Sequence, residues 1–239
     1  MKSYKEIDRK IALYSWWSRE DKNQILLKNK LTGDIFRLKI EYDEDAWHPR
    51  TDCDNLCTIT SCRGNNWDIG DEHIPRDEMS EWRDKMNEKA TRGEIWQAPV
   101  YMYDHSGQTI SLSDFGDKWD SGICAIIWVT KKKVLEEHPD ATEENWKEFA
   151  KSAAENEIKL YDQYITGEVY GYTLYKAEET EHKHISDGKT WTTTEWEWYE
   201  GVGGFYGDPV DDGLVDDAIA MVAGNNAIEN VVFVEEEEN

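Results

Sequence analysis

The stretch GICAIIWVT, at residues 122–130, decides the fold class because it is almost wholly apolar. A short apolar run bounded by turn residues and rich in β-branched side chains is typical of a strand buried on both faces. APVYMYD (98–104), QTISL (108–112) and LCTITSC (56–62) have a similar apolar and β-branched texture. We therefore predict a central buried strand at 122–130 and further strands at these three segments.

A second group of strands is predicted toward the two ends of the chain. QILLKNK and IFRLKIEYD are separated by LTGD, whose Gly33 suits a tight turn, so 24–43 is predicted to be a hairpin. IALYSWW (11–17) is interpreted as another strand, and AEETEHKHISDG (177–188) as a charged hairpin loop. The remaining apolar or alternating segments are EVYGYTLYK (168–176), TWTTTEWEWYE (190–200) and VVFV (231–234), which precedes an acidic tail at 235–239.

Helical periodicity appears in three segments. Apolar side chains recur at helical spacing along 142–165, where Thr142 can cap the helix and acidic residues occupy its first turn. Shorter amphipathic helices are predicted at 76–93 and 215–224. Because strands and helices mix without a βαβ alternation, we predict an α+β fold. It would be a single domain over 1–239, a mainly antiparallel sheet with two to three amphipathic helices packed on it.

The charge of the chain restricts its partners. Over 239 residues it has 51 acidic and 27 basic side chains, a formal net charge of −24. Lys and Arg residues that neutralise phosphates drive binding to nucleic acids and anionic membranes, so we expect direct contact with neither. A field of this sign attracts basic protein surfaces, including those that normally hold DNA or RNA. The 12 Trp and 12 Tyr residues indicate that the chain can form a folded core.

The cysteines and the N-terminus suggest a cytosolic protein. No run approaches the roughly 20 apolar residues of a membrane span, and MKSYKEIDRK lacks the apolar stretch of a signal peptide. We therefore expect reduced thiols. Cys53, Cys57 and Cys62 are more loosely spaced than the paired ligands of typical zinc sites. His48 and His73 flank them, so a metal site stays an alternative to buried or half-buried thiols.

The stretch YDHSGQTISLSDFGDKWDSG (103–122) brings a histidine, serines and aspartates together in the sequence. A catalytic serine needs a base within hydrogen-bond reach, yet neither Ser106 nor Ser121 lies in a G-x-S-x-G elbow. His105 adjoins Ser106, and adjacent residues on a strand point to opposite faces. We therefore expect DHSG and WDSG to form hydrogen-bonded turns. If the protein is an enzyme, the candidate catalytic residues are His105, Asp104, Asp120, Ser121, Asp162 and Tyr164.

Clustered carboxylates are the other candidate sites, since hard divalent cations prefer oxygen ligands. The sequence has two clusters of aspartates, and neither matches the ligand spacing of an EF-hand calcium loop. We predict no cofactor. HKH (182–184) is interpreted as part of a solvated loop. GVGGFYG (201–207) is rich in glycine but has no Lys or Arg to hold a phosphate, so it is interpreted as a flexible crossing and not as a phosphate-binding loop. The first cluster, a metal candidate, is Asp114, Asp117 and Asp120, and the second is Asp211, Asp212, Asp216 and Asp217.

Several motifs in order resemble a known family. DNLCTIT, IGDE, VYMYDHSG, WDSG, YDQYITGEVYGY and GFYGD, which span about 54–208, resemble a family of small acidic proteins encoded by tailed bacteriophages and prophages. The opening hairpin and the acidic tail lie outside the resemblance, and TSCRGNNWDIGD departs from the family, where a histidine and an aromatic residue often precede the Gly-Asp pair. The resemblance implies a phage origin and expression in the host bacterial cytoplasm, and it transfers no catalytic residues.

Three functions are compatible with these observations. The first is a non-enzymatic phage accessory protein that binds a basic host or phage protein, as a nucleic-acid mimic that inhibits a host defence or nucleic-acid enzyme. The second is a small hydrolase-like enzyme with a His/Asp/Ser pocket, and the third is an acidic subunit of a larger phage assembly. We expect the first, with an acidic interaction surface that includes Asp211, Asp212, Asp216, Asp217, Glu235 and Glu236.

Overall fold

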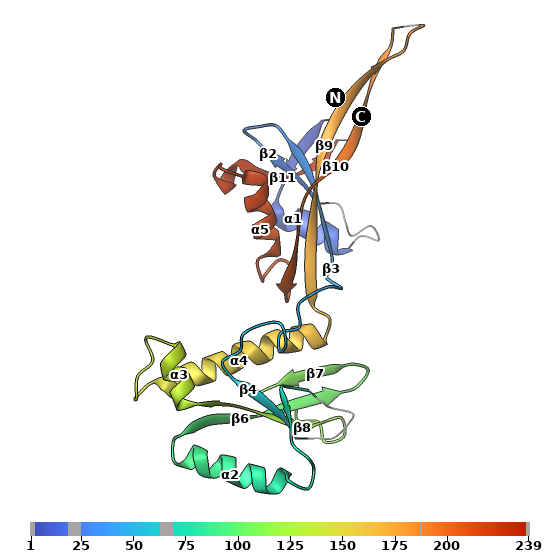
Figure 1. Cartoon of the computed structure of the whole chain (residues 1–239). Helices are drawn as coiled ribbons and strands as arrows, with labels where there is room; N and C mark the ends of the chain where they lie inside the picture. The colour runs from blue at the N-terminus through green and yellow to red at the C-terminus, as the bar shows by residue number, and fades with distance from the viewer. Residues whose placement is uncertain (1–2, 19–24, 63–68, 187, 238–239) are drawn as a thin grey trace. The chain divides into compact units, whose positions relative to one another are not determined.

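The computed structural model describes residues 3–18, 25–62, 69–186 and 188–237. The chain divides into two compact units, each with its own hydrophobic core. The first unit combines residues 1–46 with 169–239, and the second consists of residues 47–168. Figure 1 shows the helices and strands of both units. Where the sequence predicted a single domain over 1–239, the structure therefore has two cores.

The second unit is an insertion between two neighbouring strands of the first. β3 (Ile35–Tyr42) and β9 (Val169–Lys183) pair in antiparallel fashion, with Tyr42 opposite Tyr170. The amide of Asp43 also donates a hydrogen bond to the carbonyl of Val169 at 2.9 Å. The chain thus leaves the first sheet at the end of β3 and returns to it beside the point of departure.

The first unit is a six-stranded antiparallel sheet with the strand order β1-β11-β2-β3-β9-β10. Its buried residues include Leu27 and Leu38 from the sheet and Leu214 from helix α5. The predicted hairpin at 24–43 is confirmed over its described residues, with Ile25 opposite Leu38. The other elements are β1 (Tyr4–Ile7), α1 (Arg9–Ser18), β2 (Ile25–Asn29), β10 (Thr190–Tyr206), α5 (Leu214–Ala223), η1 (Ile228–Asn230) and β11 (Val231–Glu236).

Three predictions for this unit were wrong. IALYSWW lies in α1 rather than in a strand, because Asp8 caps the helix by accepting a hydrogen bond from the Lys10 amide at 2.8 Å. Periodicity alone does not distinguish a strand from a helix in so short an apolar run. The charged segment 177–188 is also mostly strand, since β9 continues to Lys183 and β10 begins at Thr190. GVGGFYG is the bulged end of β10 rather than a flexible crossing.

The second unit is a five-stranded sheet with the order β5-β4-β8-β6-β7, antiparallel except for the pairing of β4 with β5. The predicted central strand is β8 (Ser121–Thr130), between β4 and β6. Ala125 and Ile127 are fully buried, while Ile126 and Trp128 are half-buried, so only one face is wholly covered. The other strands are β4 (Thr58–Ser61), β5 (Glu72–His73), β6 (Ile95–Asp104) and β7 (Gln108–Ser111).

The helices of this unit, within its described residues, are α2 (Met79–Thr91), α3 (Lys131–Glu137) and α4 (Trp146–Ile165). α2 and α4 confirm the predicted helices, and Thr142 and Asn145 exchange hydrogen bonds in the turn that leads into α4. α3 was not predicted; the Thr130 side chain caps it by accepting a hydrogen bond from the Lys133 amide at 3.2 Å. The α+β class with mainly antiparallel pairing is confirmed, with five α-helices among the described residues instead of two to three. Of the helices in that part of the chain, none has the length and apolar character to cross a membrane.

Candidate functional site

The Asp-His-Ser-Gly motif forms the turn between β6 and β7. Asp104 pairs with Gln108 at the end of the ladder, and the His105 amide donates to the Gly107 carbonyl at 3.1 Å. Ser106 has a left-handed φ of 62°, which is uncommon outside glycine and is typical of a tight turn. The Asp104 carboxylate accepts a hydrogen bond from the Gln108 side chain at 3.2 Å. This motif therefore holds its own backbone in a hairpin.

The aspartates that follow bind neighbouring backbone amides. Asp114 accepts from Gly116 at 2.9 Å, and one oxygen of Asp117 accepts from the amides of Trp119 and Asp120 at 2.7 and 2.8 Å. The Asp120 and Trp119 amides lower the pKa of Asp117 because they stabilise its charged form. Within the described ranges, no three His, Cys, Asp or Glu side chains converge as metal ligands.

One pair of candidate catalytic residues does come together. His105 Nδ1 lies 3.1 Å from a carboxylate oxygen of Asp120, on side chains that are 65% and 39% exposed. Ser121, however, donates its hydroxyl hydrogen bond to the Asp117 carbonyl at 2.5 Å, so it closes the turn. Because water surrounds this contact, it adds little energy. The arrangement therefore links two turns and does not activate Ser121 as a nucleophile.

The remaining candidates from α4 have other contacts. Asp162 accepts hydrogen bonds from the Ile110 amide at 2.7 Å and from the Thr109 hydroxyl at 2.8 Å, so it ties α4 to β7. The Tyr164 ring packs edge-on against the His48 ring, with 4.7 Å between centroids. The structure therefore pairs His105 with Asp120 but gives Asp162 and Tyr164 separate packing roles.

Substitution of the paired residues tests the turn interpretation. His105→Ala and Asp120→Asn are each expected to lower the free energy of unfolding by less than about 1 kcal/mol, because polar contacts between exposed side chains contribute little. Urea unfolding of the second unit would measure this loss. An unchanged fold accompanied by loss of a hydrolytic activity that the unsubstituted chain shows would favour the enzyme alternative instead.

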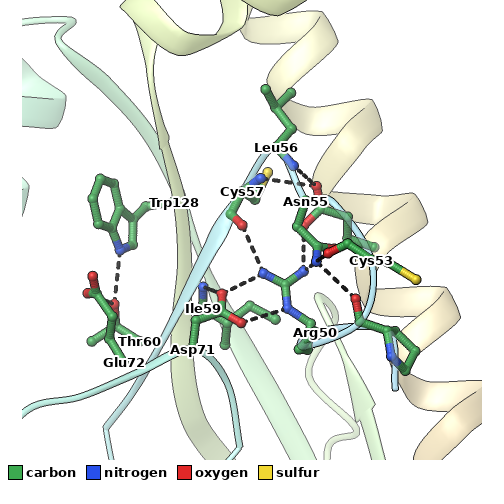
Figure 2. Close-up of polar contacts among 12 residues, drawn as sticks. Arg50, Cys53, Asn55, Leu56, Cys57, Ile59, Thr60, Asp71, Glu72 and Trp128 are labelled. Carbon is green, nitrogen blue, oxygen red and sulfur yellow. Dashed lines mark hydrogen bonds and ion pairs between the residues drawn. The ribbon is translucent and has the colours of Figure 1, made fainter. Parts of the chain in front are cut away.

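Among the described residues of the second unit, Arg50 is the centre of a dense network of hydrogen bonds (Figure 2). Its side chain is only 2% exposed. Its Nε and Nη2 bind the two oxygens of Asp71 at 2.9 and 2.5 Å. Its Nη1 donates to Glu157 at 2.6 Å and to Asn55 at 2.8 Å, and Nη2 also donates to the Cys57 carbonyl at 2.8 Å. All five N–H donors of the guanidinium thus have acceptors, and none remains for a ligand.

The acceptors around Arg50 are themselves bonded to the backbone (Figure 2). One oxygen of Glu157 accepts from the amides of Leu56 and Cys57 at 2.9 and 3.0 Å, and Asp71 accepts from the Ile59 amide at 2.8 Å. Burial lowers the pKa of Arg50, but hydrogen bonds to the two carboxylates raise it by more, so the guanidinium stays charged. Reasoning from the sequence missed this network, which joins the loop before β4 to α4.

The cysteines near this network are poor nucleophiles. Burial raises the pKa of the Cys57 thiol to about 12, and it also raises the pKa of Cys62. Cys57 and Cys124 are buried and Cys62 is half-buried, whereas Cys53 is exposed, and all four are free thiols. The thiolate is the reactive form, so the buried groups react slowly in the folded protein.

Alkylation therefore distinguishes the cysteines. At pH 8 in the folded chain, Cys53 is expected to react with iodoacetamide at least about tenfold faster than Cys57 or Cys124. Mass spectrometry of the digested protein would measure each rate. Unfolding in urea should remove the difference, and fast labelling of Cys57 before unfolding would contradict its burial.

Most carboxylates proposed for the interaction surface have partners within the first unit. Asp216 pairs with Arg9 at 2.6 Å, and Asp217 accepts a hydrogen bond from the Tyr172 hydroxyl at 2.7 Å. Burial, followed by the bond to Asp217, raises the pKa of Tyr172. Asp211 and Asp212 lie in a turn after β10 that hydrogen bonds with Asp208 close. On β11, Glu235 pairs with Lys5 at 2.9 Å, and Glu236 is exposed.

The more exposed acidic element is the end of the β9–β10 hairpin, which we call the arm (residues 177–196). β3 pairs with β9 only as far as Lys176. Beyond that position β9 and β10 have no other strand partner among the described residues (Figure 1). Glu178 lies directly opposite Glu195 on this two-stranded ribbon. Glu179 and Glu181, also exposed, form no ion pair within the part of the chain that the structure describes.

Aromatic side chains accompany these carboxylates on the arm. The His182 ring stacks on Trp191, with 5.3 Å between centroids, and His182 Nε2 lies 2.7 Å from the Thr193 hydroxyl. Trp191 is about half-exposed, and Ile185 at the tip is fully exposed. The sequence interpretation of HKH as a solvated loop therefore holds only for the tip, because His182 packs within the ladder.

Comparison with known proteins gave no assignment. No protein-family model matches the chain, and neither a search of curated proteins nor a search of solved structures found a match.

Proposed function

We propose that the chain is a non-enzymatic accessory protein that binds a basic protein partner through acidic surface. The observation that carries this proposal is the arm, where Glu178 faces Glu195 on an exposed ribbon. Like charges opposite each other destabilise a strand pair, and a two-stranded ribbon is marginal in water without further support. Lysine or arginine side chains of a partner would offset this repulsion.

The overall charge supports the same function. A net charge of −24 attracts a basic surface over a distance of about a Debye length, roughly 8–10 Å at physiological salt. Electrostatic attraction of this kind raises the rate of association and weakens as salt is added. Binding should therefore be strong at low salt and fall steeply as the ionic strength rises.

The resemblance to phage proteins extends the proposal to a class of partner. We propose a host or phage protein whose basic surface normally holds DNA or RNA, so that the chain acts as a nucleic-acid mimic in the bacterial cytoplasm. Carboxylates would take the places of phosphates against rows of Lys and Arg. Such a partner should be released from the chain by competing DNA or RNA.

A pull-down tests the proposal. The tagged chain is incubated with bacterial lysate at low and high salt, and retained proteins are identified by mass spectrometry. A nucleic-acid-processing protein that is retained at low salt and displaced by DNA or RNA supports the mimic. A stoichiometric partner that DNA does not displace supports the acidic subunit of a larger assembly, and no specific partner at either salt contradicts both.

Neutralising the arm shows whether it is the contact surface. A variant with Glu→Gln at the four arm glutamates is expected to lose at least about tenfold in partner affinity, since charges at the rim of an interface control association. A control with the same loss of charge on α2 and the α4 region should bind normally. The arm set is Glu178, Glu179, Glu181 and Glu195, and the exposed control set is Glu81, Glu88, Glu144 and Glu148.

The hydrolase-like alternative rests on one observation, the 3.1 Å approach of His105 to Asp120. A histidine held by a carboxylate is a common general base. Ser121 is bonded to the Asp117 carbonyl, however, so a nucleophile would have to come from elsewhere or from water. We therefore favour the binding function.

A further inference from the structure

The outer edge of β10 suits the binding of an extended peptide segment. We propose that residues 190–198 bind a basic, extended segment of the partner, which adds to the sheet as a further β-strand; this inference rests on the proposed binding function. β10 is an edge strand of the first sheet, and among the described residues it pairs with β9 alone. An edge strand presents a row of backbone N–H and C=O groups that can template another strand.

This part of the edge has a regular ladder. From Thr190 to Trp198 the pairing with β9 runs without a register shift, whereas bulges interrupt it between Trp198 and Glu200 and between Val202 and Phe205. Proteins protect exposed edges with charged side chains, proline or bulges. Residues 190–206 contain neither proline nor lysine, and the charged side chains of this strand are all glutamates. The segment 190–198 is therefore the regular, unbulged stretch of the strand, and its glutamates disfavour acidic strands but not basic ones.

The alternation of side chains specifies the sequence that would bind. Thr193, Glu195 and Glu197 share one face of the ribbon, and that face also carries Glu178 on β9. The other face carries Thr194 and Trp196 on β10, with Glu179 and Glu181 on β9 beyond them. A strand added beside β10 would therefore place Lys or Arg next to Glu195 and Glu197 and β-branched residues next to Thr194 and Trp196. Opposite charges and Thr or aromatic pairs stabilise neighbouring strands.

The same charges argue against a second copy of the chain as the occupant. Two β10 edges paired with each other would bring Glu195 and Glu197 against glutamates of the other copy, which is unfavourable for directly opposed like charges. Lys176 is opposite Glu197 but also pairs with Asp34 at 3.1 Å, so it leaves the acidic character of the face intact. A basic segment is the occupant that complements this edge.

A designed peptide tests strand addition separately from charge attraction. The peptide alternates Lys with Val over the length of residues 190–198, and its affinity for the full chain is measured by titration calorimetry at low salt. Two further peptides carry N-methyl groups on alternate residues, in either register, which removes backbone donors but keeps every charge. At least one methylated peptide is expected to bind about tenfold or more weakly, because several backbone hydrogen bonds are lost.

Each outcome separates this inference from the function on which it rests. Equal binding of all three peptides would overturn strand addition while leaving electrostatic capture in place. If the unmethylated peptide does not bind to a chain that still captures a protein partner, strand addition is also overturned. Glu195→Lys is the test variant of the protein and should weaken binding of the unmethylated peptide. Glu148→Lys, at an exposed position of α4, is the matched control and should not. If the pull-down finds no partner, the proposed function fails independently of the peptide result.

Discussion

Replacing Arg50 with methionine is expected to lower the free energy of unfolding of the second unit by about 3–5 kcal/mol. The side chain is 2% exposed and lies between Asp71 and Glu157, so its removal leaves two carboxylates in a poorly solvated site without their cation. The backbone amides of Leu56, Cys57 and Ile59 would still donate hydrogen bonds to these carboxylates, but no cation would compensate the negative charge of the carboxylates. Removing one partner of a buried ion pair is among the most destabilising single changes.

Hydrogen exchange measures this effect within the unit concerned. Peptides from 47–168 should lose protection in urea at a lower concentration, while peptides from 169–237 serve as an internal reference. Arg92→Met is the matched control, because Arg92 is about half-exposed and its pairs with Glu88 and Glu94 are on the surface. Equal losses for the two variants would contradict a structural role for the Arg50 network.

The second large effect is expected for Gly70→Ala, with a loss of about 2–5 kcal/mol in the same unit. Gly70 has a φ of 113°, which L side chains rarely adopt. A Cβ there would lie 2.7 Å from both the carbonyl oxygen and the Cγ2 of Ile59. That carbonyl accepts the Asp71 amide at 2.8 Å, so any shift that relieves the clash also moves Asp71 away from Arg50.

Gly93→Ala separates the clash from the backbone strain. Gly93 also has a positive φ, of 72°, but a Cβ there meets nothing within 4 Å. Its substitution should therefore cost only the conformational penalty, about 1–2 kcal/mol. Urea unfolding of both variants gives the difference, and a Gly70 variant no less stable than the Gly93 variant would show that the contact with Ile59 relaxes freely.

The elements with strong local signals were predictable. The apolar run of β8, the helical stripe of α4 and the turn with Gly33 in the β2–β3 hairpin each record their structure in consecutive residues. The turns around His105 and Asp120 were also expected from their Asp, Ser and Gly composition. The sequence named His105 and Asp120 among six candidate catalytic residues, but it did not predict that these two side chains would contact each other across separate turns.

The sequence by itself thus determined the α+β class, the long helix, the central strand and the excess of negative charge. Tertiary structure alone decided that Arg50 is buried, because its acceptors Asp71 and Glu157 are far from it in the sequence. It also decided that residues 177–183 extend β9: their charged composition predicts a loop, but a cross-strand ladder with β10 supplies the backbone hydrogen bonds that the composition does not reveal. Local periodicity records which face of an element is apolar, whereas the partner of each buried charge and each strand depends on contacts between residues that only the folded chain brings together.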